Sequence, residues 1–379
     1  MKNEDDAIFT LSLHMLYVIS CALHEVSPNE EIAGKIDLPS MYSLAKSQSL
    51  VAITCMGLEK TDAFKHADAF LFRRWTEEKA KAIRKNILLD EERKVIFEKL
   101  DASGIWHAPL KGIIIKDMYP RLGMRQMSDN DILFEKDKSK EVDAIMQKLG
   151  FDPILVSDYN NENTYHKDNY YSFEMHKKLF EDVYGDSNNY FIDIFDRVIK
   201  DGNSEYAYHM SDLDFYLYFL AHMAKHHISS GAGLRFYSDL YYINKELLPR
   251  INKNDLNREL KKLNLLDFYD ETMTFLNQLL NRDYSDADRI NYILRGNVYG
   301  SIDNTVVNSI KKKGKLKYLF SLVFLPLNNM RIMFPILEKL PILLPLFWII
   351  RIFRNLFSRE HRKRTVAYVE AMKRNKETS

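Results

Sequence analysis

The sequence predicts an α+β fold, in which a small mixed sheet lies between N-terminal and C-terminal helical regions. Apolar residues recur at helical spacing up to about residue 100 and again beyond residue 211, and short strand-like runs lie between them. A basic segment that contains several prolines follows at the end of the sequence. We therefore expect four regions, namely 1–100, 101–204, 205–310 and 311–379.

The composition is typical of a folded protein. Hydrophobic residues make up 46% and charged residues 28% of the 379 positions, which is enough to build more than one core. Two cysteines, Cys21 and Cys55, cannot form a disulfide framework, and this favours a reducing compartment. The acidic first residues argue against a secretory signal, and the apolar run 8–23 predicts a core helix. We expect a cytoplasmic protein.

The net charge of +1 conceals an uneven distribution. Residues 311–379 contain 16 of the 54 Lys and Arg residues but only 4 of the 53 Asp and Glu residues. The other 310 residues therefore hold 38 basic and 49 acidic side chains. A basic tail behind an acidic body indicates a polyanion or an anionic membrane as a partner for the tail, with the protein peripheral at the inner membrane face.

Residues 100–200 predict a small α/β unit. IWHAPL is a strand candidate that ends at a Lys-Gly turn, and GIIIKDMY after it fits either a strand or a helix. DILF predicts the next strand. A helix is then predicted by four apolar residues on one helical face and a capping glycine, which are Val142, Ile145, Met146, Leu149 and Gly150.

Three more segments predict strands: FDPILVS, YYSFEMHKK and NYFIDIF. The second alternates strictly, so Tyr171, Phe173 and Met175 share one face. Glu174 and His176 lie on the opposite, polar face. Beyond residue 211, DLDFYLYFLAHMAKHHI and LRFYSDLYYINKELL predict aromatic-rich helices.

The stretch RQMSDNDILF places two carboxylates beside a strand. In an extended chain Asp129 and Asp131 point the same way, while Asn130 and Ile132 point the other way. Paired carboxylates are hard oxygen ligands that suit Mg²⁺ shared with substrate phosphates. A polar turn is the alternative, because Ser-Asp-Asn favours turns. A calcium loop does not fit, because apolar residues follow the second aspartate.

The surrounding residues favour phosphate chemistry. Lys111-Gly112 forms a turn where a backbone can approach phosphate, and a helix start offers free N–H groups. Glu174 can supply a third carboxylate and activate a hydroxyl nucleophile. Taken singly, Lys111 fits an ordinary surface lysine and Glu174 a solvated acid. Together they indicate in-line transfer of a nucleotidyl group with two Mg²⁺ ions.

Residues 107–151 resemble the uncharacterised bacterial nucleotidyltransferase-like family of the DNA polymerase beta superfamily. The family's Lys-Gly turn, its Tyr-Pro pair and its Arg-x-Met-x-Asp-x-Asp-x-Leu motif match Lys111-Gly112, Tyr119-Pro120, Arg125, Met127, Asp129, Asp131 and Leu133. Its later strand and helix motifs match Glu174, His176, His222, His226, Leu234, Arg235 and Asp239. The resemblance covers residues 100–245 well and the flanking helical regions loosely.

The resemblance implies a polymerase-beta-like nucleotidyltransferase core and an NTP substrate. It implies Asp129, Asp131 and Glu174 as catalytic residues and as ligands of Mg²⁺. We assign nucleotide binding to Lys111, Gly112, Arg125, His176, His222, Lys225, His226 and Arg235. Many active members of the superfamily have Gly-Ser at the phosphate turn, so here Lys111 would replace the serine as a point charge.

Two helical pairs have more than one interpretation. His222 and His226 share a helix face but lack the glutamate of a zinc protease motif, so we expect them to pack on the catalytic unit or contact the nucleotide. Arg235 and Asp239 are also four residues apart. They fit a helix-surface ion pair worth about 0.3–0.5 kcal/mol, or Arg235 contacts the substrate.

The C-terminal region fits a helical subdomain or an in-plane membrane contact. Its longest uncharged run, 340–350, contains two prolines and is shorter than the roughly 20 residues that span a bilayer. Membrane contact is favoured by aromatic and basic residues together, namely Phe347, Trp348, Phe353, Phe357, Arg351, Arg354, Arg359, Arg362, Lys363 and Arg364. Nucleic acid is a weaker candidate, because no nucleic-acid-binding motif is present.

Three functions remain open on the sequence. The leading one is a Mg²⁺-dependent nucleotidyltransferase that transfers NMP from an NTP to a hydroxyl or phosphate acceptor, in surface-polysaccharide or natural-product biosynthesis. The second is a non-catalytic nucleotide-binding scaffold that docks at anionic membranes. The third is a nucleotidyltransferase toxin that modifies RNA or protein.

Overall fold

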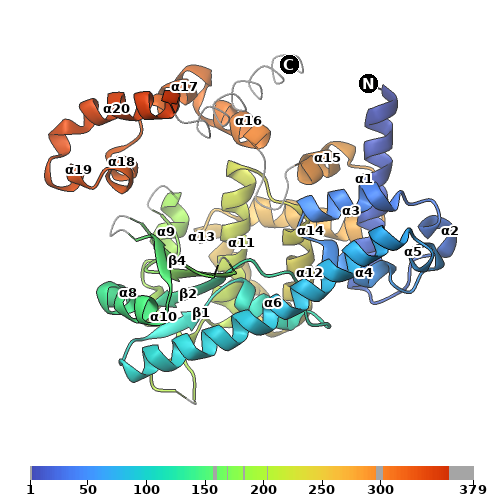
Figure 1. Cartoon of the computed structure of the whole chain (residues 1–379), viewed down its shortest axis with the longest axis horizontal. Coiled ribbons are helices and arrows are strands. Elements are labelled where there is room, and N and C mark those ends of the chain that lie inside the picture. The colour runs from blue at the N-terminus through green and yellow to red at the C-terminus, as the bar shows by residue number, and fades with distance from the viewer. Residues whose placement is uncertain are drawn as a thin grey trace.

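A five-stranded mixed sheet lies in the middle of the chain and confirms the α+β prediction (Figure 1). The computed structural model describes residues 2–156, 160–168, 170–181, 184–202, 204–295 and 302–357. The strands are β1 (His107–Pro109), β2 (Asn130–Phe134), β3 (Asp152–Leu155), β4 (Glu162–Lys167) and β5 (Tyr171–His176). Their order is β1-β2-β5-β4-β3, and only β2 and β5 are parallel neighbours.

The two faces of the sheet differ in polarity. Side chains alternate between the faces along each strand. Ile132, Phe134, Phe173 and Met175 point to one face and form a core with α6 (Ala69–Ala102) and α8 (Ser139–Lys148). The opposite face carries the polar residues of β2, β4 and β5, so the alternation predicted for YYSFEMHKK is confirmed.

The N-terminal helices are α1 (Lys2–Leu23), α2 (Glu30–Ala33), α3 (Leu38–Ser47), α4 (Val51–Leu58) and α5 (Asp62–Lys65). The core helix expected near the N-terminus is confirmed as α1. Helix α6 follows, and the Asp68 carboxylate caps it by accepting from two backbone N–H groups. Trp75 at its start lies in the larger core and Ile96 near its end lies under the sheet, so α6 ties the two cores together.

Helices also cover the polar face of the sheet. The chain first forms α9 (Gly185–Phe191), α10 (Ile194–Arg197) and a short strand pair, β6 (Ile199–Lys200) and β7 (Tyr208–His209). Five longer helices follow: α11 (Asp212–Ser229), α12 (Leu234–Leu247), α13 (Lys253–Lys262), α14 (Leu266–Leu280) and α15 (Ala287–Arg295). Helix α11 is capped by Ser211 and buries ten of its residues. It is therefore the central helix of the larger core and fixes the wall above the sheet.

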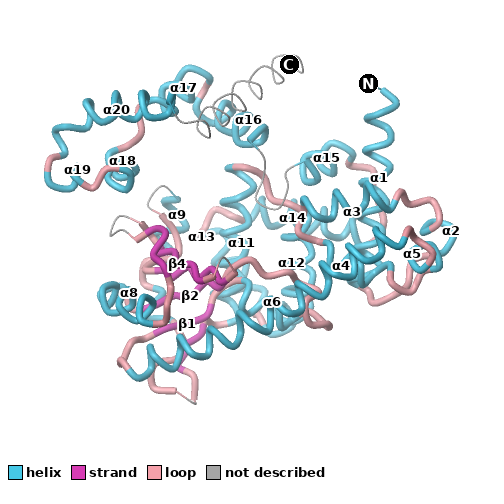
Figure 2. Tube along the Cα trace, viewed as in Figure 1, coloured by secondary structure: helices cyan, strands magenta, loops and turns pink. Residues whose placement is uncertain are grey.

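The C-terminal region is helical where it is described. It comprises α16 (Ile302–Lys313), α17 (Lys315–Val323), α18 (Leu327–Met333), α19 (Ile336–Lys339) and α20 (Leu344–Phe357). Figure 2 shows α17–α20, which we call the arm, projecting away from the sheet and its covering helices. Within the described residues, none of the helices combines the length and apolar character needed to cross a bilayer. The basic residues Arg359, Arg362, Lys363 and Arg364 lie outside the described residues.

Two assignments change or become definite in the structure. NYFIDIF is not a strand: it contributes to α9 and α10, and the strand prediction was wrong. Phe191 and Ile194 are buried three residues apart, whereas Ile192 is 70% exposed, which is a helical and not an alternating pattern. GIIIKDMY, for which strand and helix were both open, forms α7 (Gly112–Ile115) and a 3-10 turn (Lys116–Met118). The four-region division of the chain stays a prediction.

Candidate functional site

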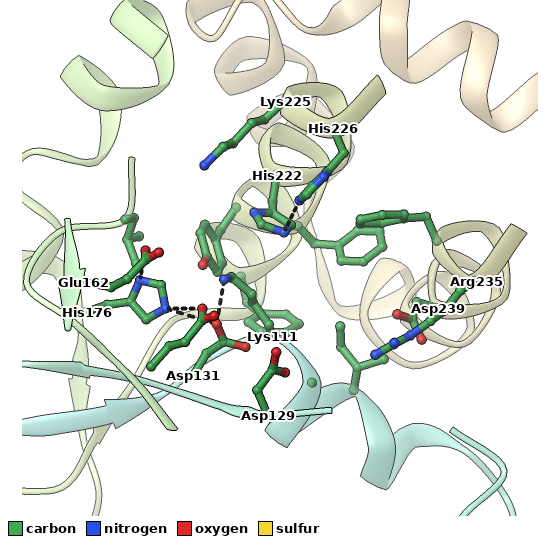
Figure 3. Close-up of a pocket in the computed structure, with 18 of the residues that line it drawn as sticks. Lys111, Asp129, Asp131, Glu162, His176, His222, Lys225, His226, Arg235 and Asp239 are labelled. Carbon is green, nitrogen blue, oxygen red and sulfur yellow. Dashed lines mark hydrogen bonds and ion pairs between the residues drawn. The ribbon is translucent and has the colours of Figure 1, made fainter. Parts of the chain in front are cut away.

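The register of two parallel strands builds the centre of the site. Asp131 on β2 lies directly opposite Glu174 on β5, so both carboxylates point to the face that α11 covers. His176 follows two residues after Glu174 and shares that face. Its Nε2 lies 3.0 Å from Asp131 Oδ1 (Figure 3). The same nitrogen lies 3.6 Å from Glu174 Oε2. Because an ionised carboxylate only accepts, this contact assigns the ring proton to Nε2.

Strand β4 extends this cluster by one more acid. Glu162 is the register partner of His176, and its Oε2 lies 3.5 Å from His176 Nδ1. The imidazole therefore lies among three carboxylates. Burial and the nearby Lys111 favour the neutral ring, but the bonds to Asp131 and Glu174 prevail and raise the pKa of His176.

Lys111 brings a cation to the same carboxylate. Its Nζ lies 2.6 Å from Asp131 Oδ1, and both side chains are largely buried. The turn before α7 aims the lysine there, because the Leu110 N–H donates to the Asp131 carbonyl at 2.9 Å. Lys111 has a φ of 42°, a conformation that favours glycine, so the backbone at this turn is strained.

Asp129 stands just before β2 and lines the same pocket as Asp131. Helix α6 holds the preceding loop, because Lys85 donates to the Ser128 carbonyl at 2.7 Å. On the other side of the strand, Asn130 accepts from Arg93 of α6 at 3.0 Å. The expectation that the two aspartates share one face while Asn130 points away is thus met by the structure.

The two aspartates differ in electrostatics. Burial raises the pKa of Asp129, and the nearby charge of Asp131 raises it further. Burial acts in the same direction on Asp131, but Lys111 and His176 outweigh it and hold the pKa of Asp131 below its usual range. Asp131 is therefore the stable anion of the pair, and Asp129 gains most from an additional cation.

The residues present fit a divalent cation. Asp131, Glu174 and His176 offer ligand atoms that all lie within 4.8 Å of one another, and Asp129 lines the same pocket. Two carboxylates of this group are the hard oxygen donors that Mg²⁺ prefers. The structure adds His176 to this group, in which its Nε2 would have to lose its proton before it could bind an ion, whereas the sequence pointed to Asp129, Asp131 and Glu174.

The pocket above these residues has a volume of about 290 Å³ and a second wall made by α11 and α12. This wall includes the remaining predicted nucleotide-binding residues, namely His222, Lys225, His226 and Arg235. Figure 3 shows them across the pocket from the carboxylates. The structure thus brings together residues that lie more than 100 positions apart in the sequence, from Lys111 to Arg235.

The two histidines of α11 form a close pair beside an aromatic ring. Their Nε2 atoms lie 3.1 Å apart, and the His226 ring lies 5.4 Å from that of Phe236. Burial, together with the smaller effects of the Lys225 and Lys111 charges, lowers the pKa of His226 to about 4. Burial and the same lysine at 111 also hold the pKa of His222 well below its usual range. Both rings are neutral near pH 7.

We expect this pair to make the fold sensitive to acid. The folded-state pKa of His226 lies below the unfolded value of 6.5, so the unfolded chain binds more protons between about pH 6.5 and about pH 4. The free energy of unfolding should therefore fall as the pH drops through this window. His226→Gln should remove about 2 kcal/mol of that fall at most, measured by urea unfolding at about pH 7 and about pH 4.5. Equal falls in wild type and variant would contradict the assignment.

The predicted helix-surface pair of Arg235 and Asp239 is wrong. Asp239 is buried and binds Arg125 instead, with Nε to Oδ1 at 2.8 Å and Nη2 to Oδ2 at 2.9 Å. Tyr119 donates to the same carboxylate at 2.7 Å. Asp239 pairs with Arg125 because α12 packs on the loop before β2. The four-residue spacing between Arg235 and Asp239 along the helix does not determine the partner. Arg235 is left facing the pocket beside Asp129.

Close packing explains why glycine stands at position 112, and the sequence did not show this reason. A Cβ at this position would come within 2.7 Å of Arg125 Nη1 and 2.9 Å of Met127 Cε. Glycine therefore lets the Lys111-Gly112 turn pack on the Arg125–Asp239 pair. Its predicted role in letting the backbone approach phosphate stays a prediction.

Several pocket residues were missed in the sequence. Glu162 begins β4, whose polar sequence ENTYHK gives no strand signal beyond Tyr165, and Asn161 directly precedes this strand. Tyr218 and Phe236 also line the pocket, but their helices are aromatic throughout, so no pattern separates them from core residues. The spacing of Tyr218 four residues before His222 was the one available signal.

Comparison with known proteins supports the family resemblance. Residues 34–281, well over half of the chain, match a family model described as uncharacterised nucleotidyltransferase. No curated protein and no solved structure matches the chain. The sheet, the carboxylate-lined pocket and the extent of the match agree with the predicted fold and enzyme class. The chain therefore belongs to this nucleotidyltransferase family.

Proposed function

We propose that this chain is a Mg²⁺-dependent nucleotidyltransferase that transfers NMP from an NTP to a hydroxyl or phosphate acceptor. The observation that carries the proposal is the meeting of Asp131 and Glu174 across parallel strands, beneath a pocket that also holds Asp129, Lys111 and Arg235. Carboxylates on one wall and cations facing them match the needs of a metal-bound triphosphate.

We assign the cation to the acidic wall. Asp129, Asp131 and Glu174 would hold Mg²⁺, and we expect a two-ion site. A ring nitrogen of His176 lies within 4.8 Å of the carboxylate oxygens of Asp131 and Glu174. When bound, the metal would neutralise phosphate charge and orient the reacting oxygens. His176 also keeps Asp131 in place through the 3.0 Å contact, and Glu162 orients the other side of the ring.

The chain's own cations would hold the triphosphate. Lys111 reaches the carboxylates from the turn, and its Nζ can pass from Asp131 to a phosphate oxygen without leaving the pocket wall. Arg235 lines the pocket and, among the described residues, forms no hydrogen bond or ion pair. Arg125 is bound to Asp239, so we propose that it positions the phosphate turn and α12.

The wall of α11 and α12 suits the nucleoside. The rings of His226 and Phe236 both line the pocket, and neutral histidines can both donate and accept hydrogen bonds. The Nζ of Lys225 lies 4.9 Å from the centre of the Tyr184 ring and 3.7 Å from Glu181 Oε1. The nearby carboxylate therefore neutralises part of the charge of this lysine at the border of the pocket. We propose that His222 and His226 contact the sugar or base while Lys225 bounds the open side.

The proposed step is a substitution at the α-phosphorus. An acceptor oxygen forms a bond to this phosphorus, the bond to the bridging oxygen of the β-phosphate breaks, and pyrophosphate leaves with the electron pair. For a hydroxyl acceptor, Glu174 takes the proton. A phosphate acceptor is already an anion and needs no base.

A binding experiment tests the metal and nucleotide assignment. Titration of each NTP into the protein should give binding that requires Mg²⁺, because the acidic wall repels the triphosphate without it. The variant Asp129→Asn with Asp131→Asn should lose this binding by about 100-fold or more. Ile192→Glu, a surface change outside the pocket, serves as the matched control and should bind as wild type does. A double variant that binds NTP as tightly as wild type would refute the site.

A labelling experiment identifies the acceptor. Cell extract is incubated with the protein, Mg²⁺ and each α-labelled NTP, and the labelled fraction is separated into glycan, lipid, protein and RNA. We propose a glycan or small-molecule acceptor of a biosynthetic pathway, and label in that fraction would support it. Label on protein or RNA would instead support a modifying toxin, and binding without any label would support the scaffold function.

A further inference from the structure

The arm has an outward apolar stripe. Of the large apolar residues exposed in the described part of the chain, half lie between Phe320 and Phe353, which is under a tenth of the sequence. In α20, Leu346, Ile349, Ile350 and Phe353 are all exposed. Their spacing places them on one side of the helix, so they form a continuous stripe and not a scatter of single residues.

The opposite side of α20 is fixed to the rest of the arm. Trp348 Nε1 donates to the Leu325 carbonyl at 2.9 Å, and the Trp348 ring lies 5.0 Å from Phe324. Arg351 donates to the carbonyls of Val323 and Leu322 at 3.0 Å each. The helix therefore cannot roll over to bury its stripe without breaking these contacts. The stripe faces outward because the contacts of Trp348 and Arg351 hold the opposite side of α20 against the rest of the arm.

Charge at the stripe is almost all positive. Residues 315–357 contain six Lys and Arg residues and one acid, and the sequence on both sides of this segment is also basic. Lys317, Lys339 and Arg354 are exposed. Arg354 follows Phe353 directly and also lies 5.1 Å from the Phe334 ring, so its position at the edge of the stripe is held. Apolar side chains bordered by cations fit a surface that is apolar beneath and anionic at its boundary.

We propose that the arm docks in the plane of an anionic phospholipid bilayer. Leu346, Ile349 and Phe353, together with the 84% exposed Ile342, would enter the boundary between headgroups and acyl chains. Lys339 and Arg354 would lie at the phosphate level. Helix α20 has 14 residues and is roughly 21 Å long, which is shorter than the hydrocarbon layer of about 30 Å, so it lies along the surface and does not cross it.

A second copy of the chain is a poorer occupant of this surface. If two arms met stripe to stripe, their cations would face one another at close range and repel. The acidic body of another copy offers opposite charge. Among the residues that the structure describes, however, the exposed apolar side chains outside the arm are distributed over many elements and do not supply a matching helical stripe. Anionic lipid satisfies both the apolar and the charge requirement.

Helix α16 connects the docked arm to the pocket. Asn308 Nδ2 donates to the His227 carbonyl at 3.2 Å and to Tyr292 Oη at 3.0 Å, so α16 is bound to the C-terminal end of α11. A Cβ on Gly231 would come within 2.7 Å of Asn304 Nδ2, which shows how closely α16 approaches the next loop. A docked arm therefore holds the pocket beside the membrane.

Co-sedimentation with vesicles tests the proposal on the full-length protein. The protein should bind vesicles of phosphatidylcholine with phosphatidylserine far better than phosphatidylcholine alone, and added salt should weaken the binding. Lys339→Gln with Arg354→Gln should weaken it roughly fivefold for each cation removed. Leu346→Glu, Ile349→Glu and Phe353→Glu together should abolish it. The far-UV circular dichroism spectrum and the urea-unfolding midpoint of each variant, compared with those of the wild type, serve as the folding check.

The matched control places three glutamates on exposed apolar residues outside the arm. Phe70→Glu, Ile87→Glu and Ile192→Glu together add the same charge and should bind vesicles nearly as wild type does. Equal loss in this control, or undiminished binding of the arm variant, would overturn the proposal. So would light scattering that shows a dimer of the wild type and a monomer of the arm variant, because a second copy would then cover the stripe. Vesicle binding is measured without NTP, so it stands or falls separately from catalysis.

Discussion

Glu174→Gln should lower the turnover number by about 10²–10⁴-fold. The glutamate faces Asp131 across the parallel strands and is the acid that we propose takes the proton of a hydroxyl acceptor. Glutamine keeps the size and one oxygen but cannot accept that proton. Because Asp129 and Asp131 remain, NTP binding in Mg²⁺ should change much less than turnover. Rates of label transfer at saturating NTP, compared with the apparent KM, measure the two effects separately.

Glu162→Gln is the matched comparison for this prediction. Glu162 lies on the adjacent strand and approaches the other nitrogen of His176, so it shares the local charge without facing Asp131 in the register. We expect a loss in turnover of about tenfold or less, since a residue that orients another is less critical than the base itself. A greater loss in Glu162→Gln than in Glu174→Gln would transfer the role of the base to Glu162.

Arg125→Met should destabilise the protein by about 3–5 kcal/mol. The variant leaves the carboxylate of Asp239 buried, because Arg125 supplied the two bonds at 2.8 and 2.9 Å. Of the donors in the described part of the chain, the Tyr119 hydroxyl alone would then remain. Both partners are nearly inaccessible, with side chains exposed by 7% and 4%. Urea unfolding at neutral pH measures the change in the free energy of unfolding.

Two further variants make this result interpretable. Arg125→Met with Asp239→Leu removes both charges, so most of the lost stability should return. Arg121→Met breaks an ion pair with Glu59 whose arginine is 43% exposed, and it should cost about 1 kcal/mol or less. If Arg125→Met were as mild as Arg121→Met, the buried pair would not hold α12 on the loop before β2.

The parts of the site that the sequence predicted depend on short-range patterns. Strict alternation in YYSFEMHKK placed Glu174 and His176 on one face, and the pair of aspartates two residues apart flanked an apolar strand. Both patterns follow from the two-residue repeat of extended chains, so they persist in the folded protein. The long helices were also evident, because their apolar stripes repeat over many residues.

The parts that were missed depend on contacts between distant segments. Asp239 pairs with Arg125, which is 114 positions away, and no spacing within α12 indicates this choice. Strand β4 is polar because one of its faces belongs to the site, so Glu162 lacked the apolar alternation that marks a strand. NYFIDIF is a short, mostly apolar run, and such a run fits a strand as well as a helix. Packing against the rest of the protein decides between the two.

The contact of Lys111 with Asp131 has a thermodynamic consequence. At 2.6 Å the ammonium already neutralises the carboxylate, so the proposed divalent cation would have to compete with it for Asp131. A triphosphate that entered with the cation would accept the released lysine, which would recover part of that cost. Each ligand would therefore raise the affinity for the other by the same factor, because the linkage between two equilibria is reciprocal. The protein should discriminate against free Mg²⁺ and free nucleotide in favour of the complex that carries both.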